Sequence, residues 1–163
     1  MDYYSFIIDE KKVGYYETEI KGGIYYQNAL LVMQGNQVQS EFWVKLVDNK
    51  MVSFKYDDSD WVEITKFPEN SYPTCALTLL AKEIKDGATL EYQQINEGKN
   101  EVTGKAQLKR TGKKVEETVN GKVSRYLIYN DNNEIVEFGW GGTAKSVKVK
   151  DKASATLDTA FRE

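Results

Sequence analysis

Residues 70–87, NSYPTCALTLLAKEIKDG, have the pattern of a helix in a chain that otherwise has the pattern of β-strands. The apolar residues of this stretch recur at the spacing of one helical face: Ala76, Leu77, Leu80, Ala81 and Ile84. The spacing predicts a helix over about residues 72–85. Pro73 would lie in its first turn, where a missing N–H costs nothing, and Gly87 would follow its end.

A short helix with one apolar face is not stable alone, so the remaining chain must cover it. The flanking segments alternate apolar and polar residues, as at 37–47 and 101–111, and tight turns separate them. Turns this short exclude parallel βαβ units, which need long crossovers. We therefore predict a mainly β fold, in which a single highly curved antiparallel sheet wraps around the central helix. We expect about ten strands, forming a half- or near-closed barrel.

The strongest hairpin signal is Asn120-Gly121, which lies between two strand-like segments. A two-residue turn there places Glu116 opposite Arg125, and Thr118 opposite Val123. Opposite charges at facing positions stabilise a strand register. We therefore interpret Glu116 as a structural ion-pair partner and not as a catalytic carboxylate.

The length of 163 residues predicts a single domain over residues 1–163, with a weakly patterned, loose tail at 151–163. The net charge of −3, with both signs mixed along the chain, argues against a nucleic-acid partner, which would require a basic excess. No stretch approaches about 20 continuous apolar residues, so we expect no transmembrane segment.

The composition restricts the chemistry that is available. The chain contains no histidine, which excludes catalytic pairs that need one and histidine-liganded metal sites. The single cysteine, Cys75, excludes an intrachain disulfide, and its place beside Ala76 favours a packed thiol. The acidic turn at 57–60 lacks the glycine and glutamate of a calcium-binding loop. We therefore expect no enzymatic activity, no metal and no cofactor; carboxylates such as Asp57 and Glu63 are explained as turn and surface residues.

The order of elements is similar to that of a known group. An opening hairpin carries Val13-Gly14, and several long strands lead to FPENSYP (67–73) and the apolar helix. An NGK turn (120–122) and a strand headed by an Asp/Asn turn (131–135) follow. This order resembles the LolA/LolB-like half-barrel group, including bacterial uncharacterised and putative glycolipid-binding families. The resemblance implies an open, curved sheet around helical segments, lipid or acylated cargo, and an extracytoplasmic location.

The predicted function is non-enzymatic binding of a lipid or other apolar ligand in the concave face of the sheet. Seven residues of inward parity are the candidate cavity lining: Phe42, Phe54, Tyr56, Val102, Leu108, Phe138 and Trp140. Side chains could instead fill the interior completely, as in small closed sheets. The alternative is then a protein–protein interaction module of the inhibitor or immunity type, using Trp43 and the edge at 143–150. The cellular location stays open, because the opening MDYYSFIIDE has no signal-peptide pattern and favours the cytoplasm.

Overall fold

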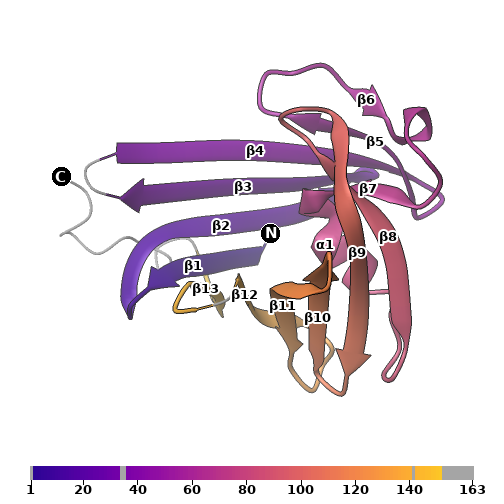
Figure 1. Cartoon of the computed structure of the whole chain (residues 1–163). Helices are drawn as coiled ribbons and strands as arrows, with labels where there is room; N and C mark the ends of the chain where they lie inside the picture. Colours follow the sequence, from indigo (N-terminus) through magenta and orange to yellow (C-terminus); the bar gives the residue numbers. More distant parts are fainter. Residues whose placement is uncertain (1, 34–35, 141, 152–163) are drawn as a thin grey trace.

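The computed structural model describes residues 2–33, 36–140 and 142–151, which form one continuous β-sheet and one short α-helix (Figure 1). The loose tail expected at 151–163 lies outside the described residues, except for Asp151. The strands are β1 (Asp2–Ile8), β2 (Lys11–Lys21), β3 (Ile24–Met33), β4 (Asn36–Val47), β5 (Lys50–Tyr56), β6 (Val62–Glu63), β7 (Ser71–Pro73), β8 (Thr89–Asn96), β9 (Glu101–Thr111), β10 (Lys114–Val119), β11 (Lys122–Tyr129), β12 (Ile135–Trp140) and β13 (Lys145–Val149). The helical segments are η1 (Ile64–Lys66), η2 (Thr74–Ala76) and α1 (Leu77–Ala81).

Within the described residues, the first and last strands lie next to each other in the middle of the sheet. The strand order is β6-β5-β4-β3-β2-β1-β13-β12-β11-β10-β9-β8-β7, so β1–β6 and β8–β13 are two meanders that meet at the β1–β13 pair. Neighbouring strands are antiparallel except β7 and β8, which are parallel. The prediction of a mainly β, mostly antiparallel fold with one short helix is confirmed.

The shape of the sheet corrects the expectation of a highly curved, half- or near-closed barrel of about ten strands. The sheet has thirteen strands, is open, and is not strongly curled. Its two outermost strands, β6 and β7, contain only two and three residues and do not pair with each other. Closure needs tilted edge strands long enough to bond across the gap. In Figure 1, β1–β4 run across the view while β8 and β9 run steeply down it, so the sheet turns by twisting.

The helix is shorter than the predicted span of residues 72–85. Residues 71–73 form β7, in which Pro73 has an extended backbone (φ −64°, ψ 154°) and pairs with β8. Residues 74–76 form the 3₁₀ segment η2, and the five-residue α1 follows it. After α1 the N–H groups of Glu83 and Ile84 bond to carbonyls three residues back, which tightens the chain out of the α-helix. The proline therefore ends a strand and does not begin the helix.

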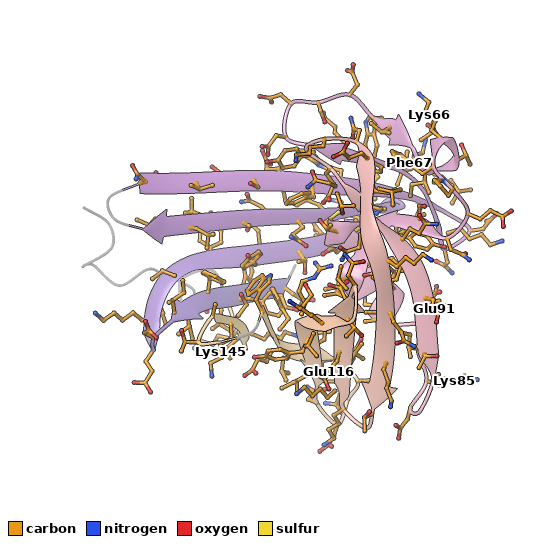
Figure 2. All side chains as sticks on the ribbon, in the orientation of Figure 1. Lys66, Phe67, Lys85, Glu91, Glu116 and Lys145 are labelled. Atoms are coloured by element: carbon orange, nitrogen blue, oxygen red, sulfur yellow. The ribbon has the colours of Figure 1, made fainter. Side chains whose placement is uncertain are left out.

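The predicted apolar face of the helix is buried, as expected. Leu77 and Leu80 are 6% and 4% exposed, and they pack in one cluster with side chains from both halves of the sheet. Tyr16 of β2 and Leu127 of β11 belong to the same cluster. Figure 2 shows side chains filling the region between the two halves around α1. The prediction that β-structure from both flanks covers the helix is confirmed.

Truncation of the helix face tests this packing. We expect Leu80→Ala to lower the free energy of unfolding by about 2–5 kcal/mol, because it removes buried methyl groups and leaves a cavity. Lys82→Ala, at an exposed position at the end of α1, is the control and should change it by less than about 0.5 kcal/mol. Urea unfolding followed by circular dichroism measures both. Equal effects would contradict a buried helix face.

Candidate functional site

A cavity of about 240 Å³ lies where the start of the helical segment meets the sheet. Its lining comes from β1–β4, from η2 and α1, and from β11 and β12. Strands from both halves of the sheet therefore contribute, together with the helix that they bury. The sequence predicted a ligand site in the concave face of the sheet, and this cavity lies between the sheet and the helical segment.

The structure brings together three of the seven predicted lining residues. Phe42, Phe138 and Trp140 line the cavity. The other four lie elsewhere. Phe54 and Leu108 are fully buried in packed clusters, and Val102 packs against one of those clusters. Tyr56 packs against Phe42 with its ring tilted and the ring centroids 5.0 Å apart. Alternation along a strand identifies the face on which a residue lies but not which part of that face is filled by packed neighbours.

Aromatic side chains form one wall of the cavity. The rings of Tyr4 and Tyr16 meet the ring of Phe138 edge to face, with centroids 5.1 and 5.2 Å apart. Phe6 meets Trp140 in the same way at 5.2 Å. Edge-to-face contacts are favourable beyond the area they bury. They hold this wall in one arrangement before any ligand binds.

Small residues on β3 and β4 leave the space that the cavity occupies. A row of facing residues crosses four strands, from Tyr4 to Tyr16, then to Ala29 and Ser40. All four line the cavity, and the change from large to small side chains along the row opens the volume. Ala29 and Ser40 were not predicted from the sequence. The signal available was their small size at positions of inward parity.

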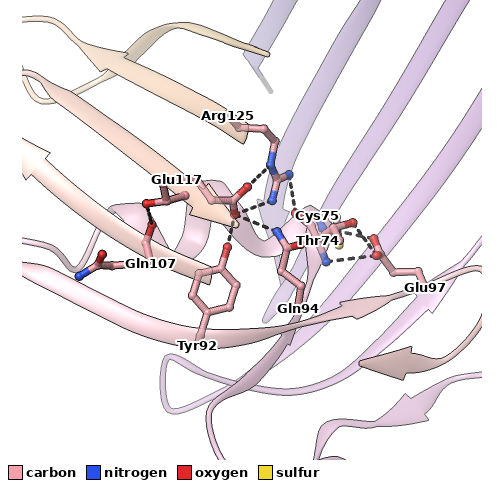
Figure 3. Close-up of polar contacts among 9 residues, drawn as sticks. Thr74, Cys75, Tyr92, Gln94, Glu97, Gln107, Glu117 and Arg125 are labelled. Carbon is pink, nitrogen blue, oxygen red and sulfur yellow. Dashed lines mark hydrogen bonds and ion pairs between the residues drawn. The ribbon is translucent and has the colours of Figure 1, made fainter. Parts of the chain in front are cut away.

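Arg125 is the one charged side chain among the described residues that line the cavity. It extends from β11, and only 17% of its side chain is exposed. Its Nε and Nη2 donate to the two carboxylate oxygens of Glu117 at 2.7 and 2.8 Å, and its Nη1 donates to the Thr74 carbonyl at 2.8 Å (Figure 3). The guanidinium thus links β10, β11 and the start of η2.

Glu117 is fully buried, and its two oxygens accept four hydrogen bonds. Besides the two from Arg125, Oε2 accepts one from the Tyr92 hydroxyl and one from Gln94 Nε2 at 3.1 Å (Figure 3). A buried carboxylate is tolerated when it is paired and its lone pairs are satisfied. Burial, followed by the nearby Glu117 charge, raises the pKa of Tyr92, so its hydroxyl stays protonated and donates at neutral pH.

The identity of the ion-pair partner corrects the prediction of Glu116. The structure pairs Arg125 with Glu117, whereas Thr118 faces Val123 as predicted. The register shifts between Glu117 and Thr118, because one extra residue, Ser124, lies on β11 after the Asn120-Gly121 turn. A turn-based count cannot detect such a bulge. Its effect is to move the paired carboxylate from the predicted position to the buried face.

A second buried carboxylate, that of Glu97, holds the start of η2. It is 5% exposed and accepts bonds from the Thr74 N–H at 3.1 Å, the Thr74 hydroxyl at 2.5 Å and the Cys75 N–H at 3.2 Å. It therefore satisfies backbone donors that a helix start leaves open. Burial, and then the Glu97 charge, raises the pKa of the Cys75 thiol well above its ordinary value. Cys75, which lines the cavity, is thus a neutral thiol at neutral pH, as the packed-thiol interpretation expects.

The cavity lining offers apolar contact and hydrogen-bond donors. Burial raises the pKa of Tyr16 to about 12, so its hydroxyl is also neutral at pH 7. The described residues contain no group of three or more acidic or cysteine side chains placed to hold a metal ion. Among them, no helix is both long enough and apolar enough to cross a bilayer. The lining of the cavity suits the binding of an apolar molecule.

A charged hollow of about 380 Å³ adjoins the cavity. The two share Tyr4, Thr18 and Thr78 in their linings. In the hollow, Lys148 makes ion pairs with Asp2 at 3.5 Å and with Glu134 at 3.0 Å. An apolar space therefore lies beside a polar one.

The buried ion pair provides a test of the site. We expect Arg125→Met to cost about 3–5 kcal/mol of unfolding free energy, because it leaves the Glu117 carboxylate buried without its partner. The double variant Glu117→Gln/Arg125→Met removes both charges at similar volume and should regain most of that stability. Urea unfolding measures both variants. A double variant no more stable than the single one would contradict the role assigned to the pair.

The comparisons with known proteins come from fold and not from sequence. No family model matches the chain, and no curated protein matches its sequence. A solved structure of a DUF1089 family protein from Pseudomonas aeruginosa is similar over 80% of this chain and 90% of that chain, with a TM-score of 0.48 and 9% sequence identity. The chain is thus structurally similar to a mainly β protein of that family, without a sequence family assignment.

Proposed function

We propose that this chain is a non-enzymatic binding protein that holds a small apolar or lipid-like ligand in the 240 Å³ cavity. The observation that carries the proposal is an open volume bounded by a preformed aromatic wall, beside a helix whose apolar face is otherwise packed. Ligand sites are typically concave, mostly apolar and largely preformed, with a few placed polar groups. This cavity has each of these properties.

The size of the cavity limits the ligand. An apolar cavity of about 150 Å³ takes up benzene, so the volume here suits an apolar group of roughly ten non-hydrogen atoms. A longer amphiphile would place its polar part in the adjoining hollow, where Asp2, Glu134 and Lys148 lie. The order of elements resembles that of the LolA/LolB-like group, several members of which carry lipid or acylated cargo, and this agrees with the proposal even though the sheet is not a half-barrel. Membership of that group is itself part of the proposal.

Tryptophan fluorescence tests the binding. The chain has three tryptophans, and Trp43→Phe/Trp61→Phe leaves Trp140, which lines the cavity, as the only reporter. We expect 1-octanol to change the Trp140 emission saturably, because it displaces water from beside the indole. We also expect native mass spectrometry of freshly purified protein to detect a retained apolar compound.

A matched pair of variants controls this test. Ser40 lines the cavity, whereas its neighbour Gln39 is exposed and points to the opposite face of β4. Ser40→Phe should fill the cavity and weaken octanol binding about tenfold or more, and Gln39→Phe should leave it unchanged. A bare chain mass with no response to octanol would overturn the proposal. Retention of a stoichiometric polypeptide would favour the protein-interaction alternative.

A further inference from the structure

The guanidinium of Arg125 has more N–H donors than its described partners use. It carries five N–H groups, and three donate to the partners already described: two to Glu117 and one to the Thr74 carbonyl. One N–H on Nη1 and one on Nη2 have no partner among the described residues. Arg125 also lines the cavity. Donors left unpaired in a mostly buried place favour any ligand that brings an acceptor to them.

The fixed charges around Arg125 decide which acceptor fits. The formal charge of the guanidinium is already balanced by Glu117, which holds it through two hydrogen bonds. The second buried carboxylate, Glu97, binds Thr74, whose carbonyl accepts from Arg125. Arg125, Glu117 and Glu97 together carry a formal charge of −1. A negatively charged ligand group would therefore meet no net positive charge here, whereas an uncharged acceptor would gain the hydrogen bonds without needing one.

We propose that the cavity selects an apolar ligand that carries an uncharged carbonyl acceptor, such as an ester or amide oxygen, which receives the free N–H groups of Arg125. The inference rests on the proposed function and specifies its ligand class. The aromatic wall contacts the apolar part of the ligand, and Arg125 recognises the carbonyl. A free carboxylate of the same chain length is disfavoured by Glu97 and Glu117.

Three probes of similar size test the selectivity at neutral pH: methyl octanoate, octanoate and pentylbenzene. Binding is read through Trp140 in the Trp43→Phe/Trp61→Phe protein. We expect the ester to bind about tenfold more tightly than pentylbenzene, the gain of a hydrogen bond to a charged donor, and at least tenfold more tightly than octanoate. Octanoate binding equal to or tighter than the ester would overturn the charge argument.

Variants then assign the selectivity to Arg125. In Glu117→Gln/Arg125→Met the affinity ratio of ester to pentylbenzene should fall to about one. Arg110→Met is the matched control, because Arg110 lies outside the cavity lining, over the ring of Tyr129, and should keep the ratio. A ratio that persists in the double variant would overturn the inference. If pentylbenzene binds as tightly as the ester, the inferred ligand class is overturned and the proposed function stands. If none of the three probes binds, the proposed function is overturned as well.

Discussion

A carboxylate buried on the covered face of the sheet must be neutralised where it lies, and the arrangement around Glu117 follows from that requirement. Arg125 reaches it from the neighbouring strand, and Tyr92 and Gln94 reach it from β8. The same guanidinium holds the Thr74 carbonyl, so the start of the helical segment is positioned relative to three strands. Arg125, which lines the cavity, is therefore held by a polar network, while one wall of the cavity is aromatic.

This polar network contributes less to the free energy of unfolding than to the register of β10 against β11. A buried ion pair roughly balances its own desolvation, so its presence is weak evidence of a gain in stability over an apolar pair. It does restrict the chain, because other registers of β10 against β11 would move Glu117 away from Arg125. The bulge between Glu117 and Thr118 brings the carboxylate into place. One irregular position in this hairpin therefore decides that Glu117 faces Arg125.

Much of the fold could be predicted from local pattern. Alternation and turn residues indicated the antiparallel strands, and helical spacing identified a buried face that includes Leu77 and Leu80. The length of the helix could not be predicted, because Pro73 suits the end of a strand as well as a first helical turn. Whether the sheet closes depends on pairing between β6 and β7, which form its two edges and are very short. Local pattern carries no information on which strands become the edges of the sheet.

The site was predicted less completely than the fold. Three residues of the cavity lining were predicted because they are large aromatic side chains at positions of inward parity: Phe42, Phe138 and Trp140. Arg125 was recognised only as an ion-pair partner, since its access to a cavity depends on how the helix packs. Ala29 and Ser40 act by being small, and the consequence of a small side chain appears only when its neighbours across the sheet are known.

The central pairing of β1 with β13 has a consequence for how the chain folds. Tyr3 faces Val149, so the middle of the sheet joins positions that are far apart in the sequence. During synthesis, the meander from β1 to β6 emerges first and must wait for the last strand before its inner edge is covered. Contacts this distant in sequence slow folding. A circularly permuted chain that opens between β6 and β7 would make this contact local, and it should therefore fold faster while keeping the same sheet.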